Sequence, residues 1–396
     1  MYQKLSFRCT SIINKREREK NMDLTQLRKD IDEIDRQLVE LYEQRMDICK
    51  RVAEYKIENH KPVFDRQRET EKLQKVCGLA RKEENRKGVE ELFTQLMSLS
   101  RKLQYGILLE HEKNDMFSFT ICKELVDEHT KVIFQGAEGA YSQLAMEQFF
   151  GREINCDHVD TFREAMEYVA DGKADFAVLP IENSTVGIVS EIYDLLVEFE
   201  NVIVGEQIIP INHCLLGVPG AALSDIRMVY SHPQSLMQTE QFLSTHPDWE
   251  QIKMQNNAFA ARKVSEDNDK TQAAIASEYA AKRYGLTILQ RSIHQCSDNA
   301  TRFIVISGKK IFLEKAQRIS VCFELPHESG ALYHILSHFI YNNLNMSRIE
   351  SRPVKDKGFE YRFFIDCNGN LKDAAVQNAL RGLKEEALNF RILGNY

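Results

Sequence analysis

The stretch DFAVLPIENST, residues 175–185, places an apolar run directly before a cluster of polar side chains. The apolar half, residues 176–179, is typical of a buried β-strand, and we expect Pro180 to end it. In an open α/β sheet, ligands bind beyond the carboxyl ends of the strands. Glu182, Asn183 and Ser184 are therefore candidate pocket residues, although a turn followed by a helix N-cap would use the same residue types.

The surrounding sequence repeats this alternation from about residue 131 to residue 308. Short apolar runs at residues 131–134, 175–179, 228–230, 273–276 and 303–306 are separated by helical stretches. That order predicts an α/β domain made of βαβ units around a largely parallel sheet.

The block from residue 22 to residue 106 shows only helical periodicity. Its apolar residues recur at spacings of three and four, which predicts a long amphipathic helix with a narrow seam: Leu24, Leu27, Ile31, Ile34, Leu38 and Leu41. Arg45 occupies the next seam position, and Ile48 and Val52 then resume the apolar pattern. Two further helices, from about residue 66 and over residues 89–103, complete an all-α domain. A helix of more than about thirty residues needs a partner surface, so we expect a homodimer or a higher homo-oligomer.

A linker at residues 107–130 separates the helical block from the α/β block, and a third block occupies residues 318–396. It is predicted to contain strands at residues 319–325, 345–353 and 359–367, helices at 331–342 and 373–388, and a strand-like end. This βαββαβ order is typical of the ferredoxin-like α+β fold.

The composition limits the class of protein. The 396 residues are 43% hydrophobic and 28% charged, and no apolar run approaches the roughly 18 residues of a membrane span. A net charge of -7 argues against nucleic-acid binding. Nine scattered cysteines indicate reduced thiols in the cytoplasm and no structural metal. Residues 1–21 lack the apolar region of a signal peptide, and we expect translation to start at Met22.

Cationic and polar residues flank the apolar seam of the helical block, a pattern that suits a polyanionic ligand unless these are surface charges with their stems on the seam. The positions are Arg28, Arg45, Lys56, Asp65, Arg68, Glu69, Ser100 and Gln104. Together with Leu27 and Pro62-Val63, they resemble the all-helical chorismate mutase family. The resemblance implies intertwined dimers that rearrange chorismate to prephenate.

The same resemblance implies a role for each of these residues. Arg28 would be lent to the neighbouring subunit and would bind one substrate carboxylate, while Arg45 would bind the other with the help of Arg68. Lys56 and Gln104 would donate hydrogen bonds to the breaking ether oxygen, where negative charge grows. Three residues would bind the polar face of the substrate: Asp65, Glu69 and Ser100.

Five motifs follow the predicted strands of the α/β block. They are QGAEGAYS at residues 135–142, PIENST at 180–185, SHPQ at 231–234 with Gln238, AIAS at 274–277 and NATRF at 299–303. Together they resemble prephenate dehydratase over about residues 132–307, although Gln143 stands where many relatives have histidine. The resemblance implies two α/β lobes, in the manner of a periplasmic solute-binding protein, with the active site between them.

The resemblance distributes the site over both lobes. Its residues would be Tyr141, Ser142, Glu182, Asn183, Ser184, Ser231, Gln238, Ser277, Thr301, Arg302 and Phe303. Thr301 would donate a hydrogen bond to the departing hydroxyl, polarised by Arg302. Glu182 would supply a proton if burial raised its pKa. Alternatively, Arg302 anchors a substrate carboxylate or forms a salt bridge between the lobes.

The third block resembles the regulatory ACT domain. The motifs are Gly330-Ala331-Leu332 and Glu350-Ser351-Arg352-Pro353, with Tyr333 where a small apolar residue is usual. The resemblance implies phenylalanine as effector, bound at a dimer interface that Asn345 and Met346 would face. It implies no cofactor and no metal.

These resemblances predict a bifunctional enzyme that converts chorismate to prephenate and prephenate to phenylpyruvate and is inhibited by phenylalanine. Two alternatives stay open at this point. One is a non-catalytic, metabolite-binding regulatory protein, and the other is a dehydratase whose helical block serves only for dimerisation.

Overall fold

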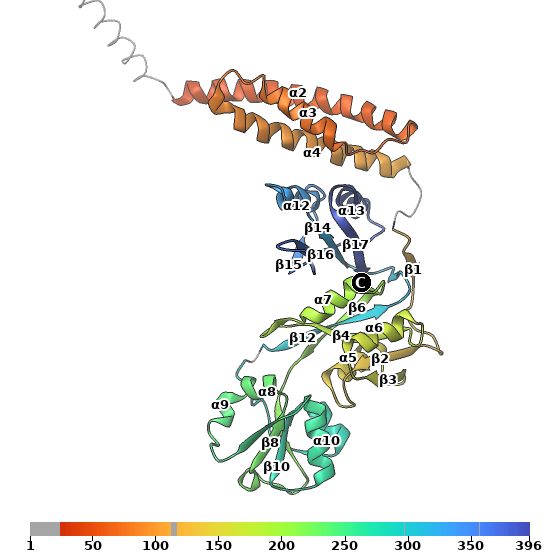
Figure 1. The fold of residues 1–396 in the computed structure, drawn as a ribbon, viewed down its shortest axis with the longest axis vertical. Helices are drawn as coiled ribbons and strands as arrows, with labels where there is room; N and C mark the ends of the chain where they lie inside the picture. The colour runs from red at the N-terminus through yellow and green to blue at the C-terminus, as the bar shows by residue number, and fades with distance from the viewer. Residues whose placement is uncertain (1–23, 112–116, 297, 356) are drawn as a thin grey trace, which may run out of the picture. The chain divides into compact units, whose positions relative to one another are not determined.

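A computed structural model describes residues 24–111, 117–296, 298–355 and 357–396. The chain forms two compact units, one up to Lys113 and one from Asn114 onward (Figure 1). The expected start at Met22 and the segment 1–21 lie outside the described residues. Among the described helices, none is both long enough and apolar enough to cross a membrane.

The first unit contains the three predicted helices and a short 3-10 turn. Their bounds are α2 Leu24–Glu58, α3 Arg66–Cys77, η1 Glu83–Asn85 and α4 Arg86–His111. α3 begins where the Asp65 carboxylate accepts a hydrogen bond from the Arg68 backbone N–H at 3.0 Å, which satisfies one free donor of the first turn. The last helix continues past the predicted end at residue 106.

The seam of α2 is buried over only part of its length. Met46 and Ala53 are buried in the part that packs on α4, whereas Leu24, Ile31 and Leu41 are more than half exposed. An apolar stripe of this length on a soluble helix is stable when another surface covers it. The exposed half of the seam therefore agrees with the expected need for a partner, which itself stays a prediction.

The second unit contains a first α/β lobe that is formed by two segments of the chain, residues 131–210 and 300–307, and the residues between these segments form a second lobe. Its elements are β2 Lys131–Gln135, α5 Tyr141–Phe150, β3 Asn155–Val159, α6 Phe162–Ala170, β4 Phe176–Asn183, β5 Gly187–Ile188, α7 Ser190–Glu198, β6 Val202–Pro210 and β12 Ala300–Ser307. β2 is parallel to β3 and β4, but β12 is antiparallel to both β4 and β6. The prediction of a largely parallel sheet is thus correct for β3-β2-β4 in this lobe and for the strands of residues 228–231, 250–253 and 272–276 in the next one, but not for β12.

The chain crosses once into a second lobe with a separate five-stranded sheet of order β11-β7-β10-β8-β9. The elements of this lobe are β7 Cys214–Gly217, η2 Leu223–Asp225, β8 Met228–Ser231, α8 Pro233–Gln238, α9 Glu240–Leu243, β9 Glu250–Lys253, α10 Asn257–Asp267, β10 Gln272–Ala276, α11 Glu278–Tyr284 and β11 Thr287–Gln290. The two lobes that the resemblance implied are therefore present (Figure 1).

Pro180 does not end β4, contrary to expectation. The strand continues to Asn183, and the register against β12 shifts at this point, so that Phe303 pairs with Pro180 and Arg302 with Glu182. Proline has no N–H for the ladder and is tolerated in a sheet at such a bulge. The polar residues 182 and 183 therefore still belong to the strand.

The C-terminal domain has the predicted βαββαβ order. Its elements are β14 Arg318–Glu324, α12 Ala331–Tyr341, β15 Met346–Pro353, β16 Tyr361–Asn368, α13 Ala374–Glu386 and β17 Leu388–Asn395. The strand order is β15-β16-β14-β17, and both helices lie on one face of this sheet (Figure 1).

The C-terminal sheet is continuous with that of the first lobe, because β17 pairs with β6 through Gly394 and Ile203. A Cβ at position 394 would lie 2.0 Å from the carbonyl oxygen of Ile203, so this approach requires glycine. The predicted linker also contributes to the second unit, since β1 Thr120–Cys122 pairs with β13 Ile311–Leu313.

Candidate functional site

A cavity of about 270 Å³ is lined by residues of both lobes of the second unit. Seven of the eleven predicted dehydratase residues line it: Tyr141, Ser142, Asn183, Gln238, Ser277, Thr301 and Phe303. The first lobe contributes β4, β12 and the start of α5, and the second lobe contributes α8 and the turn after β10. Folding thus brings together motifs that are more than a hundred residues apart in the chain.

Asn183 fixes the orientation of Thr301. The side-chain NH₂ of Asn183 donates to Thr301 Oγ1 at 3.0 Å and to Asn299 Oδ1 at 2.8 Å. Its Oδ1 accepts from the backbone N–H and the hydroxyl of Thr185, at 3.0 Å and 2.7 Å, which settles which end of the amide is the donor. Because Thr301 Oγ1 already accepts a hydrogen bond there, its own O–H is left to donate elsewhere.

A second chain of hydrogen bonds joins the lobes beside this pair. Gln238 of the second lobe donates to Thr185 Oγ1 at 3.0 Å, and its Oε1 lies 2.9 Å from Nε2 of His213. Since Gln238 Oε1 can only accept, the His213 proton is on Nε2. The connected groups therefore run from His213 through Gln238 and Thr185 to Asn183 and Thr301.

The side chains that line the cavity are amides, hydroxyls, apolar groups and two histidines. Helices α5 and α10 begin at the cavity, with Tyr141 and Asn257 among the lining residues. Free N–H groups and the positive end of the helix dipole favour an anion at such a position. The lining therefore offers neutral donors for a carboxylate.

Burial changes the acid–base behaviour of several lining groups. It lowers the pKa of His213, against a smaller opposing effect of the bond to Gln238, and it lowers the pKa of His232. Burial also raises the pKa of the Tyr141 phenol far above its ordinary value, and this hydroxyl donates to the Asn212 carbonyl at 3.0 Å. Near neutral pH, these groups therefore add no charge to the cavity.

Ser184 and Ser231 do not line the cavity, contrary to expectation. Ser184 is exposed, and its hydroxyl donates to the Asp298 carbonyl at 3.0 Å. Ser231 is buried beneath the cavity and donates to the Ile275 carbonyl at 2.8 Å. Both hydroxyls therefore support the lining without belonging to it.

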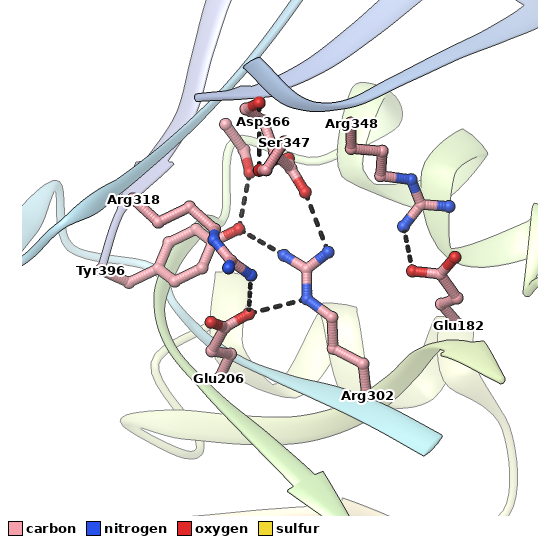
Figure 2. A network of polar contacts seen from close by, with 9 residues as sticks. Glu182, Glu206, Arg302, Arg318, Ser347, Arg348, Asp366 and Tyr396 are labelled. Atoms are coloured by element: carbon pink, nitrogen blue, oxygen red, sulfur yellow. Dashed lines mark hydrogen bonds and ion pairs between the residues drawn. The ribbon is translucent and has the colours of Figure 1, made fainter. Parts of the chain in front are cut away.

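Glu182 and Arg302 also lie away from the cavity. They are ladder partners across β4 and β12, and the adjacent ladder pair, Asn183 and Thr301, faces the cavity. Because alternate residues of a strand point to opposite faces, Glu182 and Arg302 point away from the cavity. Arg302 instead forms ion pairs with Glu206 at 2.7 Å and with Asp366 at 2.9 Å (Figure 2). Glu182 forms one with Arg348 at 2.6 Å. The predicted contacts of both residues with substrate are therefore corrected.

The sequence analysis missed several lining residues of the second lobe. These are His213, Gln234, Ser235, Asn256 and Asn257. Asn257 Oδ1 accepts from the His232 backbone N–H at 3.1 Å, and the hydroxyl oxygens of Ser231 and Ser235 lie 3.0 and 3.1 Å from it. The pair Asn256-Asn257 follows β9 and begins α10. Polar residues directly after a strand were the pattern that selected residues 182–184, so the same reasoning would have found this pair.

In the first unit, the structure brings three of the predicted mutase residues together on α2 and α4. Arg45 Nη1 donates to the Leu96 carbonyl at 3.1 Å and to the Ser100 hydroxyl, and the Gln104 amide donates to the Ser100 carbonyl at 3.1 Å. Gln104 Oε1 is buried, and no hydrogen-bond partner for it is found among the described residues. Arg45 thus lies between the two helices, as its place in the seam predicts.

The other predicted mutase residues lie near the turn from α2 to α3 or at the start of α2. Lys56 Nζ donates to the Val63 carbonyl at 2.6 Å, and Glu69 forms an ion pair with Arg101 of α4. Asp65 caps α3, as described above. Arg28 and Arg68 are exposed in the single chain, and of these two only Arg68 contacts another predicted residue through a hydrogen bond given above, from its backbone N–H to Asp65.

The predicted effector residues are divided between two ends of the C-terminal domain. Ala331 and Leu332 line a hollow of about 380 Å³ with Phe359 and Tyr361, and Gly330 caps α12 with a left-handed φ of 80°. Met346 and the preceding Asn345 lie at the opposite end of β15, because Pro353 pairs with Tyr361 and Met346 with Cys367. Arg352 binds Asp194 of α7 through two contacts of 3.0 and 3.1 Å. A single chain does not assemble these residues, which agrees with the expected interface.

Comparisons with known proteins agree with this division of the chain. A family model for prephenate dehydratase matches residues 132–311, and one for chorismate mutase type II matches residues 27–105. A curated relative from Buchnera aphidicola subsp. Schizaphis graminum, named bifunctional chorismate mutase/prephenate dehydratase, is 32% identical over 383 residues. That match covers 94% of this chain and 96% of the relative.

Two solved structures resemble the second unit. Prephenate dehydratase from Arthrobacter aurescens in complex with L-Phe has a TM-score of 0.62 at 32% identity and covers 67% of this chain and 90% of that one. A protein described as GqqA, a novel type of quorum quenching acylase, has a TM-score of 0.61 at 33% identity and covers 67% and 97%.

Proposed function

The chain belongs to the family of bifunctional chorismate mutases/prephenate dehydratases, and on this premise we propose that its two compact units carry the two activities in turn. The first unit rearranges chorismate to prephenate. The second removes carbon dioxide and the ring hydroxyl from prephenate and so forms phenylpyruvate. The observation that carries this conclusion is the relative named for both activities, because that match spans 94% of the chain.

The mutase reaction needs geometry and donors, and it needs no nucleophile. A pericyclic shift is accelerated when the extended dicarboxylate is held in its reactive conformation and when donors meet the negative charge that grows on the ether oxygen. We assign Arg45 to a carboxylate and assign Lys56 and Gln104 to the ether oxygen. The packing of Arg45 against Ser100, with Gln104 one turn further along α4, supports this assignment.

A second copy of the chain would complete the mutase site. The apolar seam of α2 is exposed over its N-terminal half, which also carries the exposed Arg28. If the same half of a second chain covers this seam, Arg28 of each chain lies close to the mutase site of the other. The arrangement is isologous, as in most symmetric dimers.

In the dehydratase reaction, the ring hydroxyl leaves as the side-chain carboxylate becomes carbon dioxide. A hydroxyl is a poor leaving group and needs a hydrogen bond or a proton as it departs. Thr301 supplies that hydrogen bond, since the Asn183 amide occupies its acceptor side and directs its O–H away from Asn183. The helix N-termini and side-chain amides of the lining hold the carboxylates.

The C-terminal domain is assigned as an ACT domain that binds phenylalanine. Its βαββαβ order, its two motifs and the L-Phe complex of the Arthrobacter aurescens relative support this assignment. The effector would bind where Ala331 and Leu332 of one chain meet Asn345 and Met346 of a second. End-product binding at such an interface inhibits if phenylalanine prefers the less active of two states.

One assay with the full chain tests the proposal against both alternatives. With chorismate as the sole substrate, we expect phenylpyruvate to accumulate and phenylalanine to slow it. A non-catalytic binding protein would consume neither chorismate nor prephenate. A chain that converts prephenate but leaves chorismate unchanged would show that the helical unit serves only for dimerisation.

A further inference from the structure

The two strands that present Asn183 and Thr301 to the cavity carry two charged residues, Glu182 and Arg302, on their other face. Across the β4/β12 ladder, Asn183 pairs with Thr301, and the next pair along is Glu182 with Arg302. Residues paired across a ladder share a face, and neighbouring pairs alternate between faces. Each cavity residue is thus one peptide bond away from a charged residue that points to the opposite side.

Arg302 is held by groups of the C-terminal domain. Its side chain is 11% exposed and donates to Asp366 of β16 at 2.9 Å and to the hydroxyl of Tyr396 at 2.7 Å (Figure 2). Ser320 of β14 joins these two acceptors, since its hydroxyl donates to Asp366 and lies 2.7 Å from that of Tyr396. The remaining contact of Arg302 is with Glu206 of β6, at 2.7 Å.

Glu182 is held by the strand that carries the predicted effector motif. Its carboxylate pairs with Arg348 of β15 at 2.6 Å (Figure 2). The guanidinium of Arg348 also lies over the Tyr193 ring of α7, 5.4 Å from the ring centroid. Glu350 and Arg352 follow Arg348 on the same face of β15, and Arg352 binds Asp194 of α7. A shift of β15 along this face would therefore move the partner of Glu182.

From this geometry we infer that Glu182 and Arg302 are positioning residues, through which the C-terminal domain sets the placement of Asn183 and Thr301. The inference rests on the proposed dehydratase function and deepens it. A partly buried ion pair tolerates little displacement, because separation leaves a charge without compensation. A change in β15 or β16 on effector binding would therefore move β4 and β12, and small misplacements of a hydrogen-bond donor are costly to catalysis.

This inference differs in its consequences from the two simpler roles. If Glu182 and Arg302 touched the substrate, their loss would raise the KM for prephenate. If they served only to join the domains, loss of any comparable contact at the same interface would have the same effect on kcat and on inhibition by phenylalanine. Arg391 of β17 provides that comparison, because it donates to the carbonyls of Val197 and Asn201 and forms an ion pair with Glu200, all in the segment from α7 to the residue before β6.

The test uses the full chain with Arg348→Met, Asp366→Asn and, as the matched control, Arg391→Met. For Arg348→Met, we expect half-inhibition of the prephenate turnover that this variant retains to require roughly 5- to 150-fold more phenylalanine, the usual range of allosteric coupling. For Asp366→Asn, we expect kcat to fall on the order of tenfold or more at an unchanged KM. Arg391→Met should change neither quantity, and circular dichroism should show that all three variants are folded.

Several outcomes would overturn the inference. They are an unchanged phenylalanine dose response in Arg348→Met, loss of phenylalanine binding by calorimetry in that variant, an unchanged kcat in Asp366→Asn, or equal effects in Arg391→Met. If Asp366→Asn does not fold, Tyr396→Phe replaces it, because this change keeps the ring and removes the hydroxyl that accepts from Arg302. If Arg348→Met does not fold, Arg348→Gln replaces it. An unmodified chain that fails to convert prephenate would instead refute the proposed function, so the two failures are distinguishable.

Discussion

The hydrogen bond from Asn183 to Thr301 makes the sharpest prediction for the dehydratase site. The variant Asn183→Asp keeps the size of the side chain and the oxygen that accepts from Thr185, but it replaces the NH₂ by an oxygen. That oxygen would lie about 3.0 Å from Thr301 Oγ1, where the NH₂ is in the parent chain. The Thr301 hydroxyl then turns to donate to the new carboxylate and is lost to the substrate.

The expected loss can be estimated from the group that is removed. Loss of one well-placed donor to a developing negative charge lowers kcat by about 10²- to 10³-fold, or about 2.7–4 kcal/mol. The new carboxylate would also face the Asn299 side-chain oxygen and the Ala300 carbonyl, which now accept at 2.8 and 3.2 Å. Leaving such acceptors unsatisfied costs on the order of 1–3 kcal/mol of folding free energy. KM should change much less than kcat.

The measurement is phenylpyruvate formation from prephenate, with mutase activity measured on the same preparation. Asn299→Asp is the matched control, because it places a carboxylate in the same network while keeping the oxygen that accepts from Asn183. A kcat for Asn183→Asp within tenfold of the parent value, or an equal loss in Asn299→Asp, would refute the assigned role of Asn183.

Three further predictions concern the mutase site and His213, which lies between β6 and β7. Gln104→Ala should lower mutase turnover by about 10²-fold or more with a smaller effect on KM, as expected for a donor to the ether oxygen, while prephenate turnover stays constant. Arg28→Ala and Arg45→Ala chains should each lack mutase activity and regain part of it when mixed, and no recovery would show that Arg28 is not lent between subunits. The pKa of His213 is below its ordinary 6.5, so the unfolded chain binds more protons as the pH falls below 6.5. Urea titrations should therefore show a free energy of unfolding that declines below about pH 6.5, and less steeply in His213→Asn.

Local pattern predicted most of the elements because each of them is specified by nearby residues. The bounds of β15 and α12 follow from alternation and from a glycine before a helical run, and the three helices of the first unit follow from their seams. The path of β4 through Pro180 could not be predicted locally, because it depends on a bulge against β12, more than a hundred residues away. The same holds for the pairing of β17 with β6, which joins two predicted domains into one sheet.

The candidate site was predicted by residue type and corrected by strand geometry. Motif resemblance selected residues 182–184 and 301–303, of which Asn183, Thr301 and Phe303 line the cavity, but it does not state which face each side chain takes. In an extended strand that face alternates, so one residue of each neighbouring pair faces the cavity and the next faces away from it. Glu182 and Arg302 were assigned to the substrate on the resemblance to prephenate dehydratase, and the register of β4 and β12 places both on the far side.

A cavity without Arg302 suits the movement of negative charge in the dehydratase reaction better than the expected contact between Arg302 and a substrate carboxylate. As carbon dioxide forms, negative charge leaves the carboxylate, so a guanidinium bound to that group would stabilise the ground state more than the transition state and would slow the step. The charge moves through the ring to the departing hydroxyl, which is where the Thr301 O–H can act. Neutral amides and helix N-termini hold the carboxylate less tightly than an arginine would. An Asn257→Arg variant should therefore bind prephenate more tightly and convert it more slowly, and a faster kcat in that variant would contradict this account of the lining.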